Sequence, residues 1–379
     1  MKIALFGPGS EFLSGISYYT ANLARALSEE HEVTVVLFRK MLPRIIFPGR
    51  ERVGAPIASL DYGRARVLPL DWHNPGTWLI AFRAIRSCDA WVLPWWTASV
   101  FHLYLALNLL RRGPKLVVEF HEILDPLEAR NPGLRWYTKA VCALLLKQAS
   151  SAVVHSEADR GVVAESFGLD ASVVPHGLFE YPRVERPEAR RRLGIPEPRV
   201  LLYFGIVRRY KGLPVLLDAF DRLPESLARE TRLLLVGEPW DDEVALRARI
   251  AASPRAGQIT WVDRYVSDDE IPHFFGAADA VVLPYLRASQ SGVAHIAIAQ
   301  GLPVVLSRVG GLESLGEYSG ATLVEPGDPA GLVAALERVL RQGPRAHPAP
   351  PLGFRETARR YTQVLERARG IRGGERANP

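Results

Sequence analysis

The sequence predicts an α/β protein built from two doubly wound domains, and two observations lead to this prediction. The chain has 379 residues, which is too long for one ordinary core and suits two domains of about 180 residues each. Short apolar runs alternate with amphipathic segments, and the alternation begins again after residue 185. Such a repeat of strands and helices is typical of two parallel sheets, each with helices on both faces.

The expected strands fall into two sets. Each is a run of four to six mostly apolar residues, as buried parallel strands require. The first set covers residues 2–6, 32–37, 90–93, 115–120 and 151–155. Between its first two strands, apolar side chains recur at helical spacing: Ile16, Tyr19, Leu23, Ala24 and Leu27. The second set covers residues 200–204, 232–236, 259–262, 280–283 and 303–306, with helices expected at 213–223 and 242–251.

A polar segment bracketed by Pro182 and Pro187 separates the two sets and is the expected linker. We therefore expect an N-terminal Rossmann-like domain at 1–182 and a C-terminal one at 183–353. A terminal helix is expected at 354–369, packing back toward the first domain. The tail at 370–379 is expected to be disordered.

The composition is that of a soluble globular enzyme, with 48% hydrophobic and 23% charged residues. The net charge of +6 is spread evenly along the chain, which argues against a nucleic-acid partner. Cys88 and Cys142 offer no disulfide framework, and we see no signal peptide and no apolar run of membrane-spanning length. These features predict a cytoplasmic protein.

Lys211 is the most informative basic residue, because the chain has only six lysines among its 47 basic residues and none follows Lys211. It comes after the expected strand at 200–204 and before the helix at 213–223, where parallel sheets bind anions. A compact ammonium binds a phosphate oxygen as a point charge. The alternative is a solvated surface lysine.

A second anion-binding feature follows the strand at 280–283. Ser291 and Gly292 come just before an apolar helix, so free backbone N–H groups are expected there, with a glycine that permits close approach. Gly310 and Gly311 open the loop after the next strand. Together with Lys211, these residues predict a seat for a diphosphate.

The first domain offers weaker signals. Gly7 and Gly9 follow the first strand, but Phe12 stands where a dinucleotide fingerprint needs glycine, so nicotinamide binding is not favoured. Gly15 opens the first helix and is either a place of close ligand approach or an ordinary cap. His121 follows the strand at 115–120, where it could face a ligand or serve structure. His176, which comes after the strand-like segment 171–174, is ambiguous in the same way.

Taken in order, these residues resemble the GT-B glycosyltransferases, specifically the retaining nucleotide-sugar transferases of family four (group 1). The likeness extends from the first strand to about residue 340. It is carried by Ser14-Gly15-Ile16, Phe120-His121-Glu122, Val154-His155-Ser156-Glu157, Val174-Pro175-His176-Gly177, Phe204-Gly205, Tyr210-Lys211-Gly212, Val236-Gly237-Glu238, Ala278-Asp279, Pro284-Tyr285, Gln290-Ser291-Gly292-Val293 and Val309-Gly310-Gly311.

The resemblance implies two Rossmann-like domains facing an interdomain cleft, with the donor in the C-terminal domain and the acceptor in the N-terminal one. It implies that Lys211 and Arg208 neutralise the departing diphosphate and that His121 contacts the sugar near the reacting carbon. The remaining donor-binding residues that it implies are Gly15, Gly237, Glu238, the backbone around Arg264 and Tyr265, Gln290, Ser291, Gly292 and Val293. No residue is assigned to the acceptor.

The chain also departs from the family pattern. Ala288 and Ile296 occupy the positions of two glutamates that many members carry, and Ile206 replaces an arginine often found after the Phe-Gly turn. The Gln-Ser-Gly segment marks a variant of the family. No Asp-x-Asp motif occurs, so we expect no metal and no cofactor, with a UDP- or GDP-sugar as co-substrate.

The function that follows is transfer of a sugar to a hydroxyl of a glycan or lipid-linked acceptor, as in cell-surface polysaccharide or glycolipid synthesis. Two alternatives stay open: a nucleotide-sugar epimerase of the same fold, and a non-catalytic nucleotide-sugar-binding subunit. Basic and large apolar residues mix between positions 35 and 60, and Trp95-Trp96 and Leu109-Leu110-Arg111-Arg112 lie in the same domain. They suggest peripheral contact with an anionic membrane, or else a partly buried loop with solvated arginines.

Overall fold

The computed structural model describes residues 1–9, 15–40, 60–71, 73–96, 100–121, 133, 136, 140, 143–343 and 345–370. These residues form two compact units. The first runs from Met1 to Gly177 and also takes in the chain from Leu352 onward, and the second is Leu178–Pro351. The units therefore divide between Gly177 and Leu178, whereas the sequence placed the boundary between 182 and 183. Most of the tail expected at 370–379 lies outside the described residues.

The first unit contains a seven-stranded sheet in which all neighbouring strands are parallel. The strand order is β3-β2-β1-β4-β5-β6-β7. The strands are β1 (Lys2–Pro8), β2 (Glu32–Lys40), β3 (Arg66–Asp71), β4 (Ala90–Trp95), β5 (Lys115–Phe120), β6 (Ser151–Val154) and β7 (Ala171–Val173). The interior strand β1 is buried from Ile3 to Pro8, as strands of a parallel sheet are when helices cover both of its faces.

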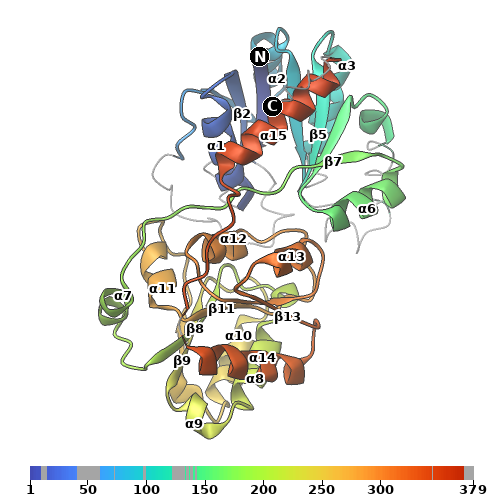
Figure 1. The fold of residues 1–379 in the computed structure, drawn as a ribbon. Coiled ribbons are helices and arrows are strands. Elements are labelled where there is room, and N and C mark those ends of the chain that lie inside the picture. The colour runs from blue at the N-terminus through green and yellow to red at the C-terminus, as the bar shows by residue number, and fades with distance from the viewer. Residues whose placement is uncertain are drawn as a thin grey trace, which may run out of the picture. The chain divides into compact units, whose positions relative to one another are not determined.

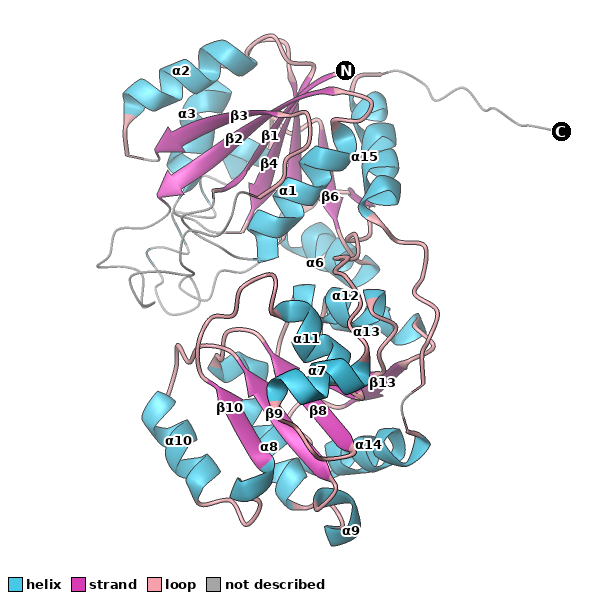
Figure 2. Cartoon of the chain, turned by 90° about the vertical axis from the view of Figure 1, so that its left-hand side faces the viewer, coloured by secondary structure: helices cyan, strands magenta, loops and turns pink. Residues whose placement is uncertain are grey.

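The helices of the first unit lie on both faces of this sheet (Figure 2). They include α1 (Gly15–Leu27), α2 (Pro75–Ile85), α3 (Phe101–Leu110), α6 (Glu157–Phe167) and α15 (Phe354–Ala368). Local sequence sets their ends: the Ser156 hydroxyl accepts a hydrogen bond from Asp159 N at the start of α6, and Gly168 ends it at φ 66°. A serine N-cap and a left-handed glycine are the expected terminators.

Helix α15 belongs to the first unit although it ends the described chain, and it packs along α1 (Figure 1). The Phe354 ring lies against Gly177, where a Cβ atom would come within 2.7 Å of it. The Thr357 hydroxyl donates a hydrogen bond to the Pro175 carbonyl at 3.2 Å. These contacts pack the first turn of α15 against the segment that follows β7.

The second unit contains a six-stranded parallel sheet in the order β10-β9-β8-β11-β12-β13. Its strands are β8 (Arg199–Phe204), β9 (Thr231–Val236), β10 (Ile259–Val262), β11 (Ala280–Leu283), β12 (Val304–Ser307) and β13 (Ala321–Val324). The α-helices around it are α7 (Arg186–Leu193), α8 (Leu213–Asp221), α9 (Glu225–Ala228), α10 (Glu243–Ala251), α11 (Ile271–Ala277), α12 (Gly292–Ala299), α13 (Gly311–Ser314) and α14 (Pro329–Gln342). Three 3₁₀ turns complete it: η2 (Arg209–Lys211), η3 (Ala256–Gln258) and η4 (Leu315–Glu317).

Both sheets have a point where the strand order reverses. In the second unit the chain builds β8, β9 and β10 outward on one side, then returns to β11 beside β8 and continues on the other side. In the first unit the same reversal lies between β1 and β4. Ligands of open α/β sheets bind outside the carboxyl ends of the strands at such reversals. Among the described residues, no helix has both the length and the apolar character needed to cross a membrane.

Candidate functional site

The residues expected to bind the donor in the second unit all follow strands of its sheet. Arg264 and Tyr265 come after β10, Gly237 and Glu238 after β9, Arg208 and Lys211 after β8, and Gln290 to Val293 after β11. In the sheet these four strands are consecutive neighbours, β10-β9-β8-β11. The sheet order therefore brings the set together at one carboxyl edge, with Lys211 and Ser291 on either side of the strand reversal.

Lys211 ends the 3₁₀ turn η2, and the glycine after it fixes its position. Gly212 has φ 67°, and a Cβ atom there would come within 1.9 Å of the Pro284 carbonyl oxygen. Only glycine fits, because both the left-handed backbone and the close approach exclude a side chain. Gly205 has φ 99°, and a Cβ there would lie 3.2 Å from Lys211 Nζ and 3.4 Å from Val293 Cγ2. The Lys211 and Val293 side chains therefore both lie next to the position that a Cβ atom of residue 205 would occupy.

The surroundings of the Lys211 ammonium are cationic and aromatic. Its Nζ lies 5.5 Å from the centroid of the Tyr285 ring, a cation–π distance. Loss of hydration lowers the pKa of Lys211 to about 8, and the charge of Arg208 acts in the same direction. The side chain is only half-buried. An anion placed beside this ammonium would relieve its repulsion from Arg208.

Arg208 is held in place from the neighbouring loop after β9. Its Nε donates a hydrogen bond to Asp241 Oδ2 at 3.0 Å, and its guanidinium lies 5.5 Å from the Trp240 ring centroid. The backbone N–H of Arg209 donates to the same carboxylate oxygen at 3.1 Å. Asp241 therefore fixes both the Arg208 side chain and the start of the turn that carries Lys211.

The N-terminus of α12 supplies backbone donors on the other side of the strand reversal. The Ser291 hydroxyl accepts a hydrogen bond from Ala294 N at 3.3 Å, as an N-cap does. The amides of Gly292 and Val293 are the first two of the helix and have no acceptor within it. His295, buried one turn on, donates from Nδ1 to the Ser291 carbonyl at 2.7 Å. Burial lowers the pKa of His295 to about 4, so this ring is neutral near pH 7.

The loop after β12 packs tightly against the loop that precedes α12. A Cβ atom on Gly310 would come within 1.9 Å of the Ala288 carbonyl oxygen, and one on Gly311 within 1.9 Å of the Ser289 carbonyl oxygen. The Gln290 side chain also lies against Gly311, with its Nε2 at 2.2 Å from such a Cβ. The two adjacent glycines therefore allow the loop after β12 to pack directly against the segment that leads into Gln290-Ser291-Gly292.

The other predicted donor residues line the same edge. Glu238 is buried, and its backbone carbonyl accepts a hydrogen bond from Val207 N at 2.9 Å. Gly237 has φ 145°, and a Cβ there would lie 2.1 Å from the Gly205 carbonyl oxygen. Arg264 pairs with Glu270 at 2.5 Å. The roles given to these residues by the resemblance stay predictions.

In the first unit, three successive strands end close to a histidine. His121 follows β5, His155 follows β6 and His176 lies beyond β7, and all three are buried. The Tyr19 ring from α1 contacts each of them, with centroid distances of 4.8, 5.2 and 4.6 Å. Gly15, at the exposed start of the same helix, has no heavy atom within 4 Å of the position of a Cβ.

A buried carboxylate, Glu119, lies at the centre of this cluster, and sequence reasoning missed it. Its side chain accepts a hydrogen bond from the Tyr19 hydroxyl at 2.6 Å and lies 3.2 Å from His121 Nε2 and 3.7 Å from His155 Nε2. Burial alone would raise the pKa of Glu119, but the two imidazoles and the hydrogen bonds of His121 and Tyr19 lower it to about 2. The signal was an ionisable residue inside an apolar strand, two positions before His121.

The cluster is closed by hydrogen bonds of its own. His155 Nδ1 lies 3.0 Å from the Val174 carbonyl and its Nε2 lies 3.3 Å from His121 Nδ1. Among the described residues, Glu119, His121 and His155 are the one group of three with metal-ligand chemistry and geometry. Each ligand atom already has a polar neighbour within the group, so we interpret it as a proton-sharing network. Both ring nitrogens of His121 face this network.

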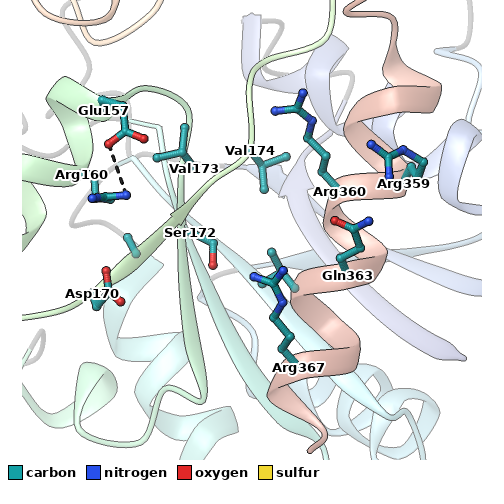
Figure 3. A pocket seen from close by; sticks show the side chains of 12 residues that line it. Glu157, Arg160, Asp170, Ser172, Val173, Val174, Arg359, Arg360, Gln363 and Arg367 are labelled. Atoms are coloured by element: carbon teal, nitrogen blue, oxygen red, sulfur yellow. Dashed lines mark ion pairs between the residues drawn. The ribbon is translucent and has the colours of Figure 1, made fainter. Parts of the chain in front are cut away.

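A groove of about 560 Å³ lies in the first unit between the edge strand β7 and helix α15 (Figure 3). Four arginines line it, together with two acidic residues: Arg160, Arg359, Arg360, Arg367, Glu157 and Asp170. Arg160 pairs with Glu157 at 3.3 Å, and Arg360 pairs with Glu356 at 2.8 Å. The excess of guanidinium groups makes this concave surface basic.

The surface suggested for membrane contact is only partly described. Residues 41–59 lie outside the described part of the chain. Trp95 is buried and packs against Phe101, with the ring centroids 4.1 Å apart, so it serves the core and cannot contact a membrane. Leu109 and Leu110, in contrast, are 70% and 53% exposed. The prediction is therefore wrong for Trp95 and stays open for the end of α3.

Comparison with known proteins agrees with the fold. The family model described as Glycosyltransferase Family 4 matches residues 13–178, and the one described as Glycosyl transferases group 1 matches residues 198–342. Between them the two models cover both units. The architecture is that of a GT-B glycosyltransferase, with two Rossmann-like domains.

Relatives support the same assignment. A D-inositol 3-phosphate glycosyltransferase from Acidothermus cellulolyticus is 26% identical over 370 residues, which cover 89% of this chain and 81% of that protein. The protein of the same name from Thermobifida fusca is 33% identical over 170 residues, or 41% of this chain and 38% of that protein. A GDP-mannose:glycolipid 4-beta-D-mannosyltransferase from Xanthomonas campestris is 29% identical over 169 residues, or 44% and 47%.

Solved structures show the same fold. A sucrose-phosphate synthase from Thermosynechococcus elongatus matches with a TM-score of 0.67 and 20% identity, covering 98% of this chain and 96% of that one. The Anabaena protein HepE, solved in complex with UDP-glucose, matches with a TM-score of 0.67 and 17% identity, covering 98% and 94%. The chain belongs to the family 4, group 1 glycosyltransferases, which transfer a sugar from a nucleotide-sugar donor.

Proposed function

We propose that this protein is a retaining, metal-independent hexosyltransferase that moves a sugar from a UDP- or GDP-sugar to a hydroxyl of a glycan or lipid-linked acceptor. The observation that carries the proposal is the meeting of Lys211 and the N-terminus of α12 on either side of one strand reversal. An ammonium and unpaired helix amides form a site for a diphosphate. HepE, which shares the fold, is described with UDP-glucose bound.

The chemistry of the reaction matches this charge distribution. As the bond between sugar and diphosphate breaks, negative charge grows on the phosphate oxygen while the sugar becomes oxocarbenium-like. Lys211, Arg208 and the amides of Gly292 and Val293 are fixed before the reaction, so they stabilise that charge without reorganisation. Neutralisation by these groups takes the place that a divalent cation has in other transferases, and no cofactor is required.

The remaining assignments rest on position. Gly237, Glu238 and the backbone at Arg264 and Tyr265 would border the base and ribose, because they follow β9 and β10, the two strands on one side of β8. His121 would lie near the sugar, and Gly15 would allow close approach of the donor. Ile296, which replaces one of the two family glutamates, has no carboxylate to offer the donor, and its side chain is buried. The Gln-Ser-Gly segment would define this variant of the family.

The acceptor is proposed to be anionic and close to a membrane surface. The Xanthomonas campestris relative acts on a glycolipid by its name, and the Acidothermus cellulolyticus relative on an inositol phosphate. In this chain, the groove between β7 and α15 is basic. Helices α2 and α3 expose apolar side chains: Leu79 at 47%, Ile80 at 64%, Leu109 at 70% and Leu110 at 53%. Exposed arginines accompany them, which suits an anionic lipid surface.

The proposal is tested by a panel of UDP- and GDP-sugars without added metal. Thermal shift measures binding of each donor, and product analysis follows its consumption with and without lipid-linked and glycan acceptors. We expect one donor to stabilise the protein and to be consumed with release of the nucleoside diphosphate. Conversion of the donor to an isomer would indicate an epimerase. Tight binding with no turnover across the acceptors would favour a non-catalytic subunit, and no binding at all would end the proposal.

A further inference from the structure

The hydrogen-bond geometry around Glu119 determines how many protons the two neighbouring imidazoles carry. The Val174 carbonyl can only accept, so His155 Nδ1 must be a donor at 3.0 Å. The Glu119 carboxylate likewise only accepts, so His121 Nε2, at 3.2 Å, must donate to it. One hydrogen is thus fixed on each ring.

The contact between the rings requires a third hydrogen. His155 Nε2 and His121 Nδ1 lie 3.3 Å apart in a buried place. Without a proton between them, two lone pairs would face each other away from water, which is unfavourable. Two neutral imidazoles hold two ring hydrogens, and this pair needs three. The pair therefore carries one positive charge, which balances the negative charge of Glu119.

We infer that Glu119 holds one imidazolium shared by His121 and His155, and that Glu119 is thereby a positioning residue for His121. This inference rests on the proposed function, in which His121 lies near the donor sugar. Through the contact with His121 Nε2, Glu119 fixes the orientation of the His121 ring, and through the shared proton it fixes the protonation of both rings beside the proposed sugar position.

The elements packed against the pair contribute further titratable groups, and they favour the same state. Tyr19 from α1 donates to Glu119, and Tyr361 from α15 is fully buried beside it. Burial, then the Glu119 charge, raises the pKa of Tyr361, so both phenols are neutral near pH 7. His176, beyond β7, has its Nδ1 at 2.7 Å from the Gly177 carbonyl, so it donates there. Glu119 contacts both rings.

The first test counts the ring hydrogens directly in the wild-type protein. Nitrogen-15 labelling of histidine and long-range proton–nitrogen spectra distinguish protonated from unprotonated ring nitrogens. His121→Asn and His155→Asn variants assign the signals. We expect three of the four ring nitrogens of the pair to carry hydrogen at about pH 7.5. Two neutral rings at that pH would overturn the inference. The spectra can be recorded whether or not the protein shows enzymatic activity.

The second test uses Glu119→Gln, which removes the charge but keeps the shape. Without the carboxylate, the extra proton leaves the pair as pH rises. At about pH 5.5, where the histidine pair of the variant still binds the extra proton, we expect its kcat/KM to approach the wild-type value. As the pair loses that proton at higher pH, kcat/KM should fall about tenfold for each pH unit. The wild-type enzyme should show no such transition in that range. A profile of unchanged shape would contradict the positioning role.

A control separates this effect from loss of stability. Asp279→Asn removes another buried carboxylate, which pairs with Arg190 at 2.6 Å in the second unit and contacts neither imidazole. We expect it to lower Tm and to leave the shape of the pH profile unchanged. If the wild-type enzyme consumes no nucleotide sugar at all, the proposed function fails, while the nitrogen-15 spectra still decide the state of the histidine pair.

Discussion

The Lys211 ammonium lies 5.5 Å above the centroid of the Tyr285 ring, so the lysine after β8 and the tyrosine after β11 meet across the strand reversal of the second sheet. Tyr285 is buried, and its ring limits where the Lys211 chain can go. The charge is thus fixed before a donor arrives. A fixed charge is what stabilisation of a departing diphosphate requires.

Replacement of Lys211 by alanine is expected to slow sugar transfer strongly. Loss of the ammonium removes a charge that acts on the leaving group, which should cost at least about 2 kcal/mol of transition-state stabilisation. The measurement is kcat/KM for the donor identified in the nucleotide-sugar panel. Lys147→Ala, at an exposed lysine of the first unit, is the matched control and should behave as wild type. Equal rates for the two variants would remove Lys211 from the mechanism.

Gly212→Ala tests the backbone that carries this lysine. The alanine Cβ would come within 1.9 Å of the Pro284 carbonyl oxygen at a residue with φ 67°, so the loops after β8 and β11 must separate. We expect a loss of at least about 2 kcal/mol in the free energy of unfolding, together with weaker UDP or GDP binding. Denaturant unfolding and titration calorimetry measure the two effects.

A second glycine separates steric clash from backbone strain. Gly194 has φ 66° at the end of α7, yet no heavy atom lies within 4 Å of the position of its Cβ. Gly194→Ala should therefore cost only about 1 kcal/mol and leave nucleotide binding intact. If both variants lost the same stability and both kept affinity, the close approach to Pro284 would have no functional importance.

The parts of the site that sequence could predict are those set by local chemistry. Lys211, Ser291 and Gly292 each follow a recognisable apolar strand, and a serine followed by an apolar run of helical length indicates a helix start. The two sheets were also predictable, but β3 and β13 were missed. Both are edge strands and only partly buried, so their sequences lack the continuous apolar run of the central strands.

The Glu119 network escaped prediction because its parts meet only through the fold. Glu119 belongs to β5, His155 follows β6, and Tyr19 lies 100 residues earlier on α1. No periodicity in the chain indicates that β5 and β6 are neighbours or which helix covers them. The membrane prediction failed at Trp95 for a related reason, since a tryptophan pair in sequence does not reveal that one ring packs against Phe101 in the core.

Independence from divalent metal is a separate expectation. Because Lys211 and Arg208 supply the positive charge, removal of trace metal with EDTA should leave the rate within about twofold of the untreated value. The measurement is the initial rate of transfer after dialysis against EDTA, with and without added Mg²⁺ or Mn²⁺. A rate that collapses on chelation and returns with one ion would show that a cation shares the diphosphate site.

Membrane contact is expected to depend on the exposed apolar side chains of α2 and α3. The double variant Ile80→Ser/Leu109→Ser removes two of them, at 64% and 70% exposure, and should reduce co-sedimentation with vesicles of anionic phospholipid about tenfold or more. Val244→Ser is the control, because Val244 is 83% exposed on α10 of the second unit. Equal sedimentation of both variants would place the membrane contact elsewhere or exclude it.

The pH dependence of nucleotide binding follows from the lowered pKa of Lys211. With a value of about 8 in the free protein, the ammonium is charged at neutral pH and loses its proton as pH rises above 8. A bound diphosphate favours the charged form, so linkage requires affinity for UDP or GDP to fall as pH rises through that value. Titration calorimetry at a series of pH values should show Kd rising, with a limiting slope of about tenfold per pH unit.

Lys211→Arg identifies the group responsible. A guanidinium stays protonated over the whole range, so the variant should bind more weakly at neutral pH, because its planar head fits the space beside Gly205 less well, but should lose the alkaline decline. Wild-type affinity that stays constant through this range, or a decline that persists in Lys211→Arg, would assign the titration to another group. The charge on the diphosphate itself does not change above pH 8, since its last proton dissociates near pH 6 to 7, at about the value of other phosphate monoesters. The slope therefore reports on the protein.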